Sequence, residues 1–390
     1  MGLVITMSTN ERVPLYQQIQ DYIRDIIAVE EMKSGDRIPT EKELMERFQV
    51  SKITVANAWT GLANEQVITR VHGKGSFVAD RGAKQGAPSS AVAVQSREVG
   101  EGRARTGLIG LVMPSIDDYF AIRLIEGIQR TLEAEGYRSM IVLSSGKIEK
   151  EKAAIKELKA LGAEGLLIFP VDEEHYNEEI LSMKFEGFPF VLMDRHLPGV
   201  ETHFIASDGR QGVRLAIDHL WELGHREIAI CSDSPLMTVT VQERIEGYIT
   251  ALKDKGALIN PAHMITGFTL AESLKESEGH PLFRYIRNRM ATAYISLNGR
   301  LGVHIYQMAR QAGLDVPGDV SIVSFDDPTS IVEEFSIFTH INQFEREMGV
   351  KAASKLLEVI RGDRNAKYFD KTLIEPRLVI RQTSGPNRQR

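Results

Sequence analysis

Polar side chains able to bind a ligand follow short apolar runs after residue 106 of this chain. Those that come directly after, or close after, such a run are Asp118, Tyr119, Phe120, Arg195 (preceded by Asp194), Asp208, Arg244, Asn298 and Asp326. Carboxylates, an amide and guanidinium groups in one cleft suit a polyhydroxylated molecule, since each hydroxyl both donates and accepts hydrogen bonds. Tyr119 or Phe120 could cover an apolar sugar face. The alternative is that the aspartates only cap helices and the arginines only pair with them.

No sequence motif of a known catalytic site stands out. Gly73-Lys74-Gly75-Ser76 lacks the spacing of a phosphate-binding loop, and the ten histidines and single cysteine show no zinc-site pattern. Asp117-Asp118 and Asp326-Asp327 could serve acid–base catalysis, but adjacent strand residues point to opposite faces. The sequence therefore predicts a non-enzyme with no catalytic residue, metal or cofactor. The alternative is an enzyme acting on a sugar or nucleotide, with an N-terminal adaptor domain.

Strands and helices that alternate along the chain must position these polar residues. The expected strands are Gly107–Met113, Ser139–Leu143, Gly165–Phe169, Phe190–Met193, Phe204–Ser207, Glu227–Cys231, Ala293–Ser296 and Ser321–Phe325. The expected helices include Ile122–Glu135, Lys150–Leu161, Gly209–Leu223, Gln242–Lys255 and Arg300–Gln311. This alternation predicts an α/β fold with parallel sheets covered on both faces. The segment is too long for one comfortable sheet, so two Rossmann-like lobes are expected, with ligands at the carboxyl ends of the strands.

A different pattern occupies the N-terminal part of the chain. The expected elements are an amphipathic helix Leu15–Glu30, helices at Glu41–Phe48 and 52–64, and strands at Val67–Val71 and Ser76–Ala79. Thr40 is a plausible cap of the second of these helices. Val55, Ala58 and Leu62 recur at helical spacing and would face the helix before them. Helix, tight turn, helix and hairpin together form the plan of a winged helix-turn-helix.

Such a domain reads duplex DNA with its second helix in the major groove and its wing near phosphate. The residues expected to contact DNA are Arg37, Thr40, Lys42, Ser51, Lys52, Thr54, Asn57, His72, Gly73, Lys74 and Gly75. The alternative is an ordinary helical hairpin followed by a surface turn.

Charge and composition narrow the class of protein. A net charge of −6 argues against a general nucleic-acid coat protein, so DNA affinity must come from local lysine and arginine placement and from two heads on a dimer. The single cysteine, Cys231, fits a reducing compartment. No run approaches the ~18 apolar residues that cross a bilayer, so a cytoplasmic protein without membrane contact is expected. Residues 81–105, rich in glycine, alanine and serine, predict a flexible linker.

The N-terminal motifs carry a specific resemblance. The run from Pro14 to Val78 resembles the DNA-binding domain of the GntR family of bacterial repressors. The matching pieces are Pro14-Leu15-Tyr16, Gly35-Asp36, Ile38-Pro39-Thr40-Glu41, Val50–Val55 and the GKGSFV wing. The family often carries arginine where this chain has Ala56, so that base contact is not carried over. The resemblance implies a head at residues 11–80 that binds double-stranded operator DNA, and a homodimer on a palindromic site is expected.

The rest of the chain is similar to the effector domain of LacI/GalR repressors, itself similar to periplasmic sugar-binding proteins. The matching pieces are IGLVMPS at the first strand, Leu223–Ala229, Arg244-x-x-Gly247-Tyr248, Val316–Asp327 and Glu375–Arg381. The resemblance implies sugar contacts for Arg244, Asn298 and Asp326. Relatives usually have Asn-Asp where this chain reads Asn298-Gly299, which makes the helix cap there uncertain.

The family also implies a division of the effector domain, at 106–385, into two lobes that exchange segments. We expect lobe 1 at about 107–207 and 340–370, and lobe 2 at about 208–338 and 371–385. A GntR-type head on a LacI-type body resembles the arabinose-responsive repressors of Gram-positive bacteria. That resemblance implies a repressor of carbohydrate-utilisation genes released by a small sugar, a pentose with L-arabinose as first candidate.

Overall fold

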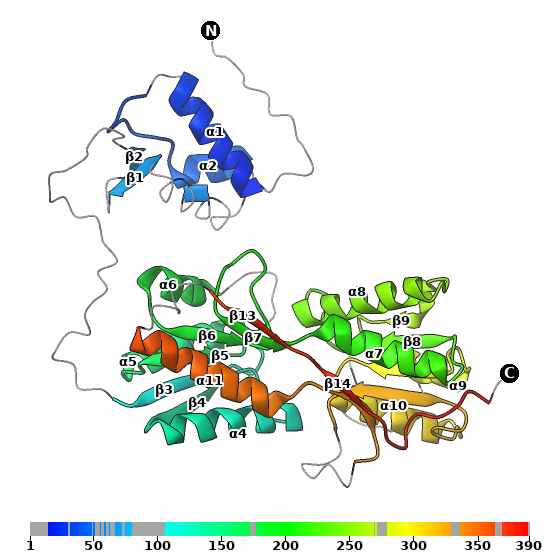
Figure 1. Ribbon diagram of the computed structural model, residues 1–390. Coiled ribbons are helices and arrows are strands. Elements are labelled where there is room, and N and C mark those ends of the chain that lie inside the picture. Colours follow the sequence, from blue (N-terminus) through cyan, green and yellow to red (C-terminus); the bar gives the residue numbers. More distant parts are fainter. Residues whose placement is uncertain are drawn as a thin grey trace. The chain divides into compact units, whose positions relative to one another are not determined.

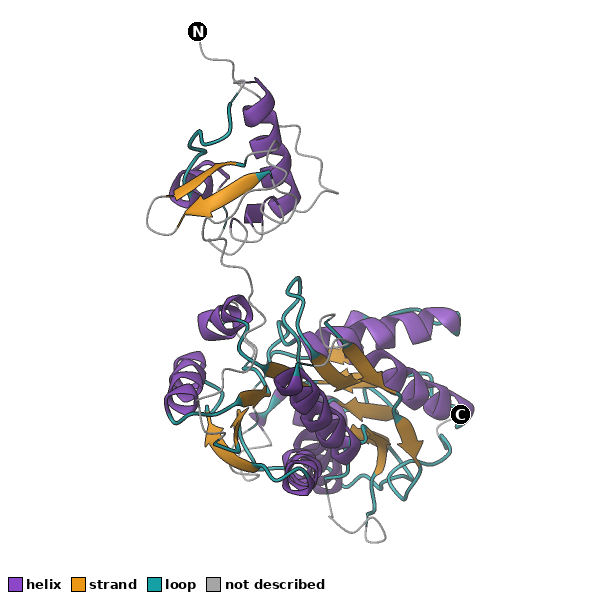
Figure 2. Cartoon of the chain, turned by 60° about the vertical axis from the view of Figure 1, so that its left-hand side comes forward, coloured by secondary structure: helices purple, strands orange, loops and turns teal. Residues whose placement is uncertain are grey.

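The computed structural model describes residues 15–29, 32–48, 50, 55, 58–59, 62, 67–71, 75–79, 106–171, 177–268, 270, 279–328, 336–362 and 369–388. The chain divides into two compact units, residues 1–101 and residues 102–390 (Figures 1 and 2). The linker expected at 81–105 lies outside the described residues. Within the described part, no helix is both long enough and apolar enough to span a bilayer.

The first unit contains the expected helices and hairpin. Its elements are α1 (Leu15–Val29), α2 (Glu41–Phe48), β1 (Ile68–Val71) and β2 (Gly75–Val78). The two strands are antiparallel, with Ile68 opposite Val78. Val55, Ala58 and Leu62 are completely buried, in one apolar cluster that includes residues of α1 and Leu44 of α2. Most of the second reading-head helix, expected at 52–64, lies outside the described residues.

A reciprocal cap starts α2. The backbone N–H of Glu43 donates to the Thr40 hydroxyl at 3.3 Å, and the Thr40 N–H donates to the Glu43 carboxylate at 2.7 Å. This is a capping box, in which two backbone donors of the first turn find partners. The predicted role of Thr40 as N-cap is confirmed.

The second unit holds two six-stranded sheets, each the centre of a lobe (Figure 1). In lobe 1 all strands are parallel, in the order β13-β7-β6-β5-β3-β4. Its strands are β3 (Leu108–Met113), β4 (Arg138–Leu143), β5 (Gly165–Ile168), β6 (Phe190–Met193), β7 (Phe204–Ser207) and β13 (Lys371–Ile374). Its helices are α4 (Tyr119–Ala134), α5 (Ile148–Ala160), α6 (Glu178–Glu186) and α11 (Glu345–Arg361).

Lobe 2 repeats this plan with the order β14-β12-β11-β10-β8-β9, in which β14 alone is antiparallel to its neighbour. Its strands are β8 (Ile228–Cys231), β9 (Met264–Ile265), β10 (Ala293–Ser296), β11 (Ser321–Phe325), β12 (Thr339–Asn342) and β14 (Arg377–Val379). Its helices are α7 (Gly209–Glu222), α8 (Val239–Asp254), α9 (Pro281–Arg287), α10 (Gly299–Gln311) and the short 3-10 helix Pro261–His263.

Both faces of each sheet are covered by helices, as the apolar runs predicted. Along β3, Ile109, Leu111 and Met113 join the cluster under α4 and α11, whereas Val112 joins the cluster under α5 and α6. In lobe 2, Ile230 lies in the cluster with α7 and α8, and its neighbour Cys231 lies in the cluster with α9 and α10. A strand that is buried on both faces consists of an unbroken run of apolar residues. Such runs made the strands recognisable in the sequence.

Two short strands lie in the opposite lobe from the one expected. Strand β12 pairs with β11 of lobe 2 although residues 340–370 were assigned to lobe 1, and β13 pairs with β7 of lobe 1 although residues 371–385 were assigned to lobe 2. Helix α11 does cover the sheet of lobe 1. A four-residue strand carries no local signal of which sheet edge it will extend, because backbone pairing with a distant strand decides it.

Candidate functional site

A cavity of about 220 Å³ lies between the two lobes, at the carboxyl ends of their strands. Lobe 1 contributes the segments that follow β3, β5 and β6, and lobe 2 those that follow β8, β10 and β11. In both sheets the connections reverse direction beside the first strand, between β3 and β5 and between β8 and β10. Ligands of open α/β sheets bind in the crevice at such a reversal. The strand order therefore places a binding crevice in each lobe, and the two crevices face one another.

Arg244 on α8 is the central cation of this cavity. Its guanidinium donates to the Leu297 carbonyl at 2.6 Å and to the side-chain oxygen of Gln343 at 2.9 Å, and it lies 4.0 Å from the centre of the Phe325 ring. A Cβ on Gly209 would stand 3.3 Å from the Arg244 side chain, so glycine leaves the room it needs. The Nε of Arg244 has no hydrogen-bond partner among the described residues. Arg244 thus presents a fixed, buried charge with an unused donor.

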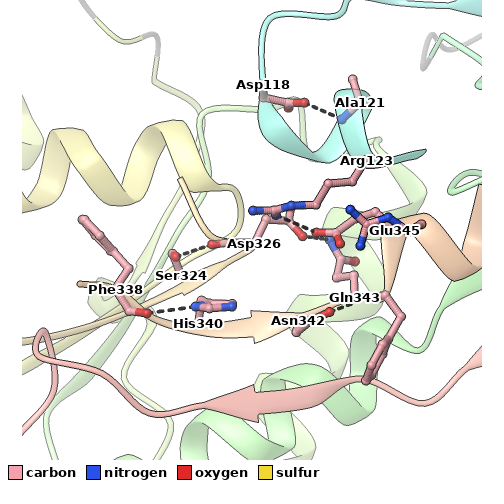
Figure 3. A network of polar contacts seen from close by, with 12 residues as sticks. Asp118, Ala121, Arg123, Ser324, Asp326, Phe338, His340, Asn342, Gln343 and Glu345 are labelled. Atoms are coloured by element: carbon pink, nitrogen blue, oxygen red, sulfur yellow. Dashed lines mark hydrogen bonds and ion pairs between the residues drawn. The ribbon is translucent and has the colours of Figure 1, made fainter. Parts of the chain in front are cut away.

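Two aspartates follow strands in the same unusual backbone geometry. Asp194 follows β6 with φ 61°, and Asp326 follows β11 with φ 63°, a left-handed conformation that aspartate tolerates better than most residues. Both side chains are more than nine-tenths buried. Gln343 donates to a carboxylate oxygen of Asp326 at 2.8 Å (Figure 3). The sharp turn directs one carboxylate from each lobe into the shared cavity.

Burial makes the ionised form of these two carboxylates costly. It raises the pKa of Asp194 above its ordinary value, and it raises that of Asp326 further, with the neighbouring Glu345 carboxylate adding to the effect. Arg244 opposes the rise at both sites. A ligand that donates hydrogen bonds to these oxygens, as a hydroxyl group can, would replace the water they have lost.

Asp118 and Asn298 combine capping with a place in the cavity wall. Asp118 accepts the Ala121 N–H at 2.8 Å (Figure 3), and Asn298 accepts the Leu301 N–H at 2.8 Å, so each caps its helix. The cap at Asn298 therefore survives the departure at Gly299. A Cβ on Gly299 would approach Pro328 to 3.0 Å, so the glycine makes space for that proline.

The structure brings together six of the eight residues predicted to bind a ligand. The residues in the cavity wall are Asp118, Phe120, Arg195, Arg244, Asn298 and Asp326. Asp208 is not in this wall, because its carboxylate caps α7 by accepting the Gln211 N–H at 3.0 Å. Tyr119 is not in it either, but lines an adjoining hollow. Capping and ligand binding select the same residue types at the start of a helix, and only the fold distinguishes them.

Phe169 and Gln343 are two of several cavity residues that sequence reasoning missed. Phe169, directly after β5, lies 4.9 Å by its ring centre from the Arg195 guanidinium and offers an apolar surface. It was read as the last residue of a strand, where an aromatic side chain is ordinary. Gln343 lies in the segment that joins β12 to α11, and an isolated glutamine gives no local signal. No group of described residues gathers three or more histidine, cysteine or acidic side chains able to hold a metal ion.

Few of the predicted DNA contacts fall within the described side chains. Arg37 is exposed on the first unit, and the Thr40 hydroxyl is engaged in the α2 cap. Gly75 begins β2 opposite Val71. The side chain of Lys42 and the residues Ser51, Lys52, Thr54, Asn57, His72, Gly73 and Lys74 lie outside the described part of the structure.

Family models and curated relatives agree on the nature of both units. Residues 15–78 match the gntR family of bacterial regulatory proteins, and residues 217–384 match the periplasmic binding protein-like domain. The arabinose metabolism transcriptional repressor of Geobacillus stearothermophilus is 28% identical over 377 residues, which cover 95% of this chain and 98% of that protein. The HTH-type transcriptional regulator DegA of Bacillus subtilis is 30% identical over 289 residues, covering 72% of this chain and 82% of that protein.

Solved structures show the same fold in the second unit. A LacI family transcriptional regulator from Enterococcus faecium with bound ribose superposes with a TM-score of 0.58 at 25% identity, covering 72% of this chain and 99% of that one. The transcriptional regulator CelR in complex with cellobiose superposes with a TM-score of 0.62 at 21% identity, covering 86% of this chain and 92% of that one.

Proposed function

Because this chain belongs to the bacterial transcriptional regulators that join a GntR-type head to a LacI-type periplasmic-binding-protein-like body, we propose that it represses carbohydrate-utilisation genes until a small sugar releases it from its operator. The observation that carries this proposal is the cavity between the lobes, where Arg244 and carboxylates from both lobes converge. The relatives are DNA-binding regulators and not enzymes. A regulator of this kind acts where its operator is, in the cytoplasm.

The chemistry of the cavity favours a sugar as the effector. Donors at Arg244 and Asn298 line the same cavity as acceptors at Asp194 and Asp326, and each sugar hydroxyl can satisfy one of each. Phe169 and Phe120 lie edge to face, with ring centres 6.0 Å apart, and supply an apolar wall for the C–H face of a ring. Pairs of fixed polar groups beside an aromatic surface distinguish a sugar from a purely apolar or purely ionic ligand.

Size and relatedness favour a pentose, with L-arabinose as the first candidate. A volume of about 220 Å³ is below the ~300–1,000 Å³ of pockets for drug-sized ligands, so a single ring is the natural occupant. The relative from Geobacillus stearothermophilus, aligned over nearly the whole of both chains, is named for arabinose metabolism.

Release from DNA requires that the sugar favour one arrangement of the lobes. A ligand held by Asp194 of lobe 1 and Arg244 of lobe 2 gains its full contacts only when the lobes approach, so it stabilises the closed form by its difference in affinity. Gln343 links Arg244 to Asp326 at the point where the chain crosses between the lobes. We propose that closure around the sugar alters the spacing of two heads on a homodimer and lowers operator affinity.

A gel-shift titration combined with calorimetry tests this function. L-arabinose should release the full-length protein from its operator, whereas Arg244→Ala should bind the operator normally and lose at least about 100-fold in sugar affinity, because a buried charged donor is gone. Arg210→Ala is the matched control: Arg210 pairs with Glu243 and Glu246 outside the cavity and should leave the response intact. Operator affinity unchanged by L-arabinose and by every other sugar of a pentose and hexose panel would refute the proposal.

A further inference from the structure

A larger hollow, which the proposed function does not use, adjoins the single-ring cavity. This outer compartment has a volume of about 640 Å³ and shares six lining residues with the inner cavity. The shared residues are Asp118, Phe120, Arg195, Ser234, Asn298 and Asp326. The two spaces therefore adjoin one another, with these six residues between them.

The walls of the outer compartment combine apolar and polar surfaces. Ile116 and Tyr119 from lobe 1 and Val303 from lobe 2 supply the apolar part. The carboxylate of Asp233 and the side chain of His304 supply the polar part, and Asp233 is held in place by an Asn298 amide that donates to it at 2.6 Å. A sugar ring has apolar C–H faces and a hydroxyl edge, and this mixture of wall types matches both.

The charge of the outer compartment selects against a phosphate group. Its arginines are Arg195 and Arg300, and its aspartates are Asp117, Asp118, Asp233, Asp326 and Asp327. Even with the deeply buried Asp326 set aside, the acidic side chains outnumber the arginines. Burial lowers the pKa of His304, which favours its neutral form. A dianionic phosphoryl group would meet a negative field here, whereas a neutral group would not.

From these observations we propose that the outer compartment is a second subsite for a neutral sugar ring, so that the effectors of this protein include disaccharides whose terminal pentose occupies the inner cavity. This inference rests on the proposed function of the inner cavity. The inner ring is held by the polar groups around Arg244, and the second ring lies between Tyr119 and Val303. A phosphate ester of the same pentose is excluded by the surplus of carboxylates.

Calorimetry on the full-length protein with three probes tests the subsite. We expect a disaccharide of two L-arabinose units to bind at least as tightly as L-arabinose, and L-arabinose 5-phosphate to bind at least about tenfold more weakly. Val303→Trp should fill the outer compartment, lowering disaccharide affinity about tenfold or more while L-arabinose affinity stays within about twofold. Val303→Ile is the matched control. Tyr119→Ala, at the other wall, should also weaken the disaccharide selectively if the larger substitution disturbs folding.

The outcomes separate the subsite from the function on which it rests. L-arabinose binding without disaccharide binding overturns the subsite and leaves the proposed function standing. Equal losses for both sugars in Val303→Trp and in Tyr119→Ala, or tight binding of the phosphate ester, also overturn it. Binding of none of the three probes overturns L-arabinose as the effector and the subsite together.

Discussion

Asp326 is a buried carboxylate in the cavity wall whose ionisation is costly to the fold. Its carboxylate is buried, receives one hydrogen bond from Gln343 and lies near a second carboxylate, Glu345. The folded chain therefore binds a proton at Asp326 more tightly than the unfolded chain does. For an acid with a raised folded pKa, the ionised group lowers the free energy of unfolding at every pH above that value. Under the proposed function, sugar hydroxyls that donate to the carboxylate would recover this lost stability.

We expect Asp326→Asn to raise the melting temperature of the sugar-free protein at neutral pH, because an amide has no charge to bury. The difference from the natural protein should be constant above the folded pKa of Asp326 and should shrink as the pH falls below that value toward the ordinary carboxyl pKa, since the folded chain then carries a proton that removes the same charge. Sugar affinity should fall about 10- to 100-fold with the loss of a charged acceptor. Thermal unfolding between about pH 5 and pH 8, with calorimetry, measures both. Asp254→Asn, at an exposed ion pair with Arg214, is the control; an equal effect there would contradict this account.

At the level of elements, glycine allows the helices of lobe 1 to approach closely. A Cβ on Gly127 of α4 would lie 2.1 Å from the Arg346 carbonyl oxygen, and one on Gly349 of α11 would lie 2.2 Å from the Leu124 carbonyl oxygen. The two helices thus touch backbone to backbone at a crossing that no side chain fits. Because α11 starts directly after the segment that crosses between the lobes, this contact also anchors one end of that segment in lobe 1.

Gly127→Ala should therefore separate α4 from α11 and lower the free energy of unfolding by about 1–3 kcal/mol, the usual cost of overpacking. Denaturant titration of the full-length protein measures this loss. Gly279→Ala provides the comparison, because a Cβ there has open space around it and the backbone does not require glycine. A Gly127→Ala protein as stable as the Gly279→Ala protein would show that the helices can adjust.

The reading head makes two kinds of contact that mutation can separate. Lys52→Ala and Asn57→Ala should each cost about 1–3 kcal/mol of preference for the operator over unrelated DNA if these residues read bases. Lys74→Ala, in the wing, should weaken binding to both DNAs alike. It should also reduce the slope of log binding constant against log salt concentration by about one. Fluorescence anisotropy across a salt series distinguishes the two patterns. Operator preference unchanged in Lys52→Ala would place the reading helix elsewhere.

For the whole molecule, the overall charge of −6 must be reconciled with binding to a polyanion. A single small head on an acidic chain gains little from general electrostatic attraction. Two heads joined through a dimer make the second contact intramolecular, which raises affinity without any new surface. This argument, and not a feature of the fold alone, is the basis for proposing a homodimer.

A palindromic operator should consequently bind about 10²- to 10⁴-fold more tightly than a duplex that carries one half-site. Gel shifts with the two duplexes at equal salt measure the ratio, and analytical ultracentrifugation of the same sample gives the oligomeric state. Equal affinity for both duplexes would indicate that the protein binds DNA as a monomer. Sugar should reduce the ratio, because it acts on the spacing of the heads.

Local patterns in the sequence determined most of the architecture. The apolar runs placed β6, β7, β10 and β11 at their observed boundaries, since strands buried on both faces are read directly from residue type. The spacing of Thr40 and Glu43 determined where α2 begins. Asn298 and Asp326, which follow strands, and Arg244, which matches a family motif, were expected in one cleft and do line the cavity. Both signals lie within a few residues of the chain.

Tertiary structure alone decided what depends on distant segments meeting. It placed β12 and β13 in their lobes through pairing with β11 and β7, and brought Gln343 between Arg244 and Asp326. It also separated Asp208, which only caps a helix, from Asp118, which caps a helix and lines the cavity. Residue type is the same in both cases; the packing of the two lobes determines which carboxylate faces the ligand.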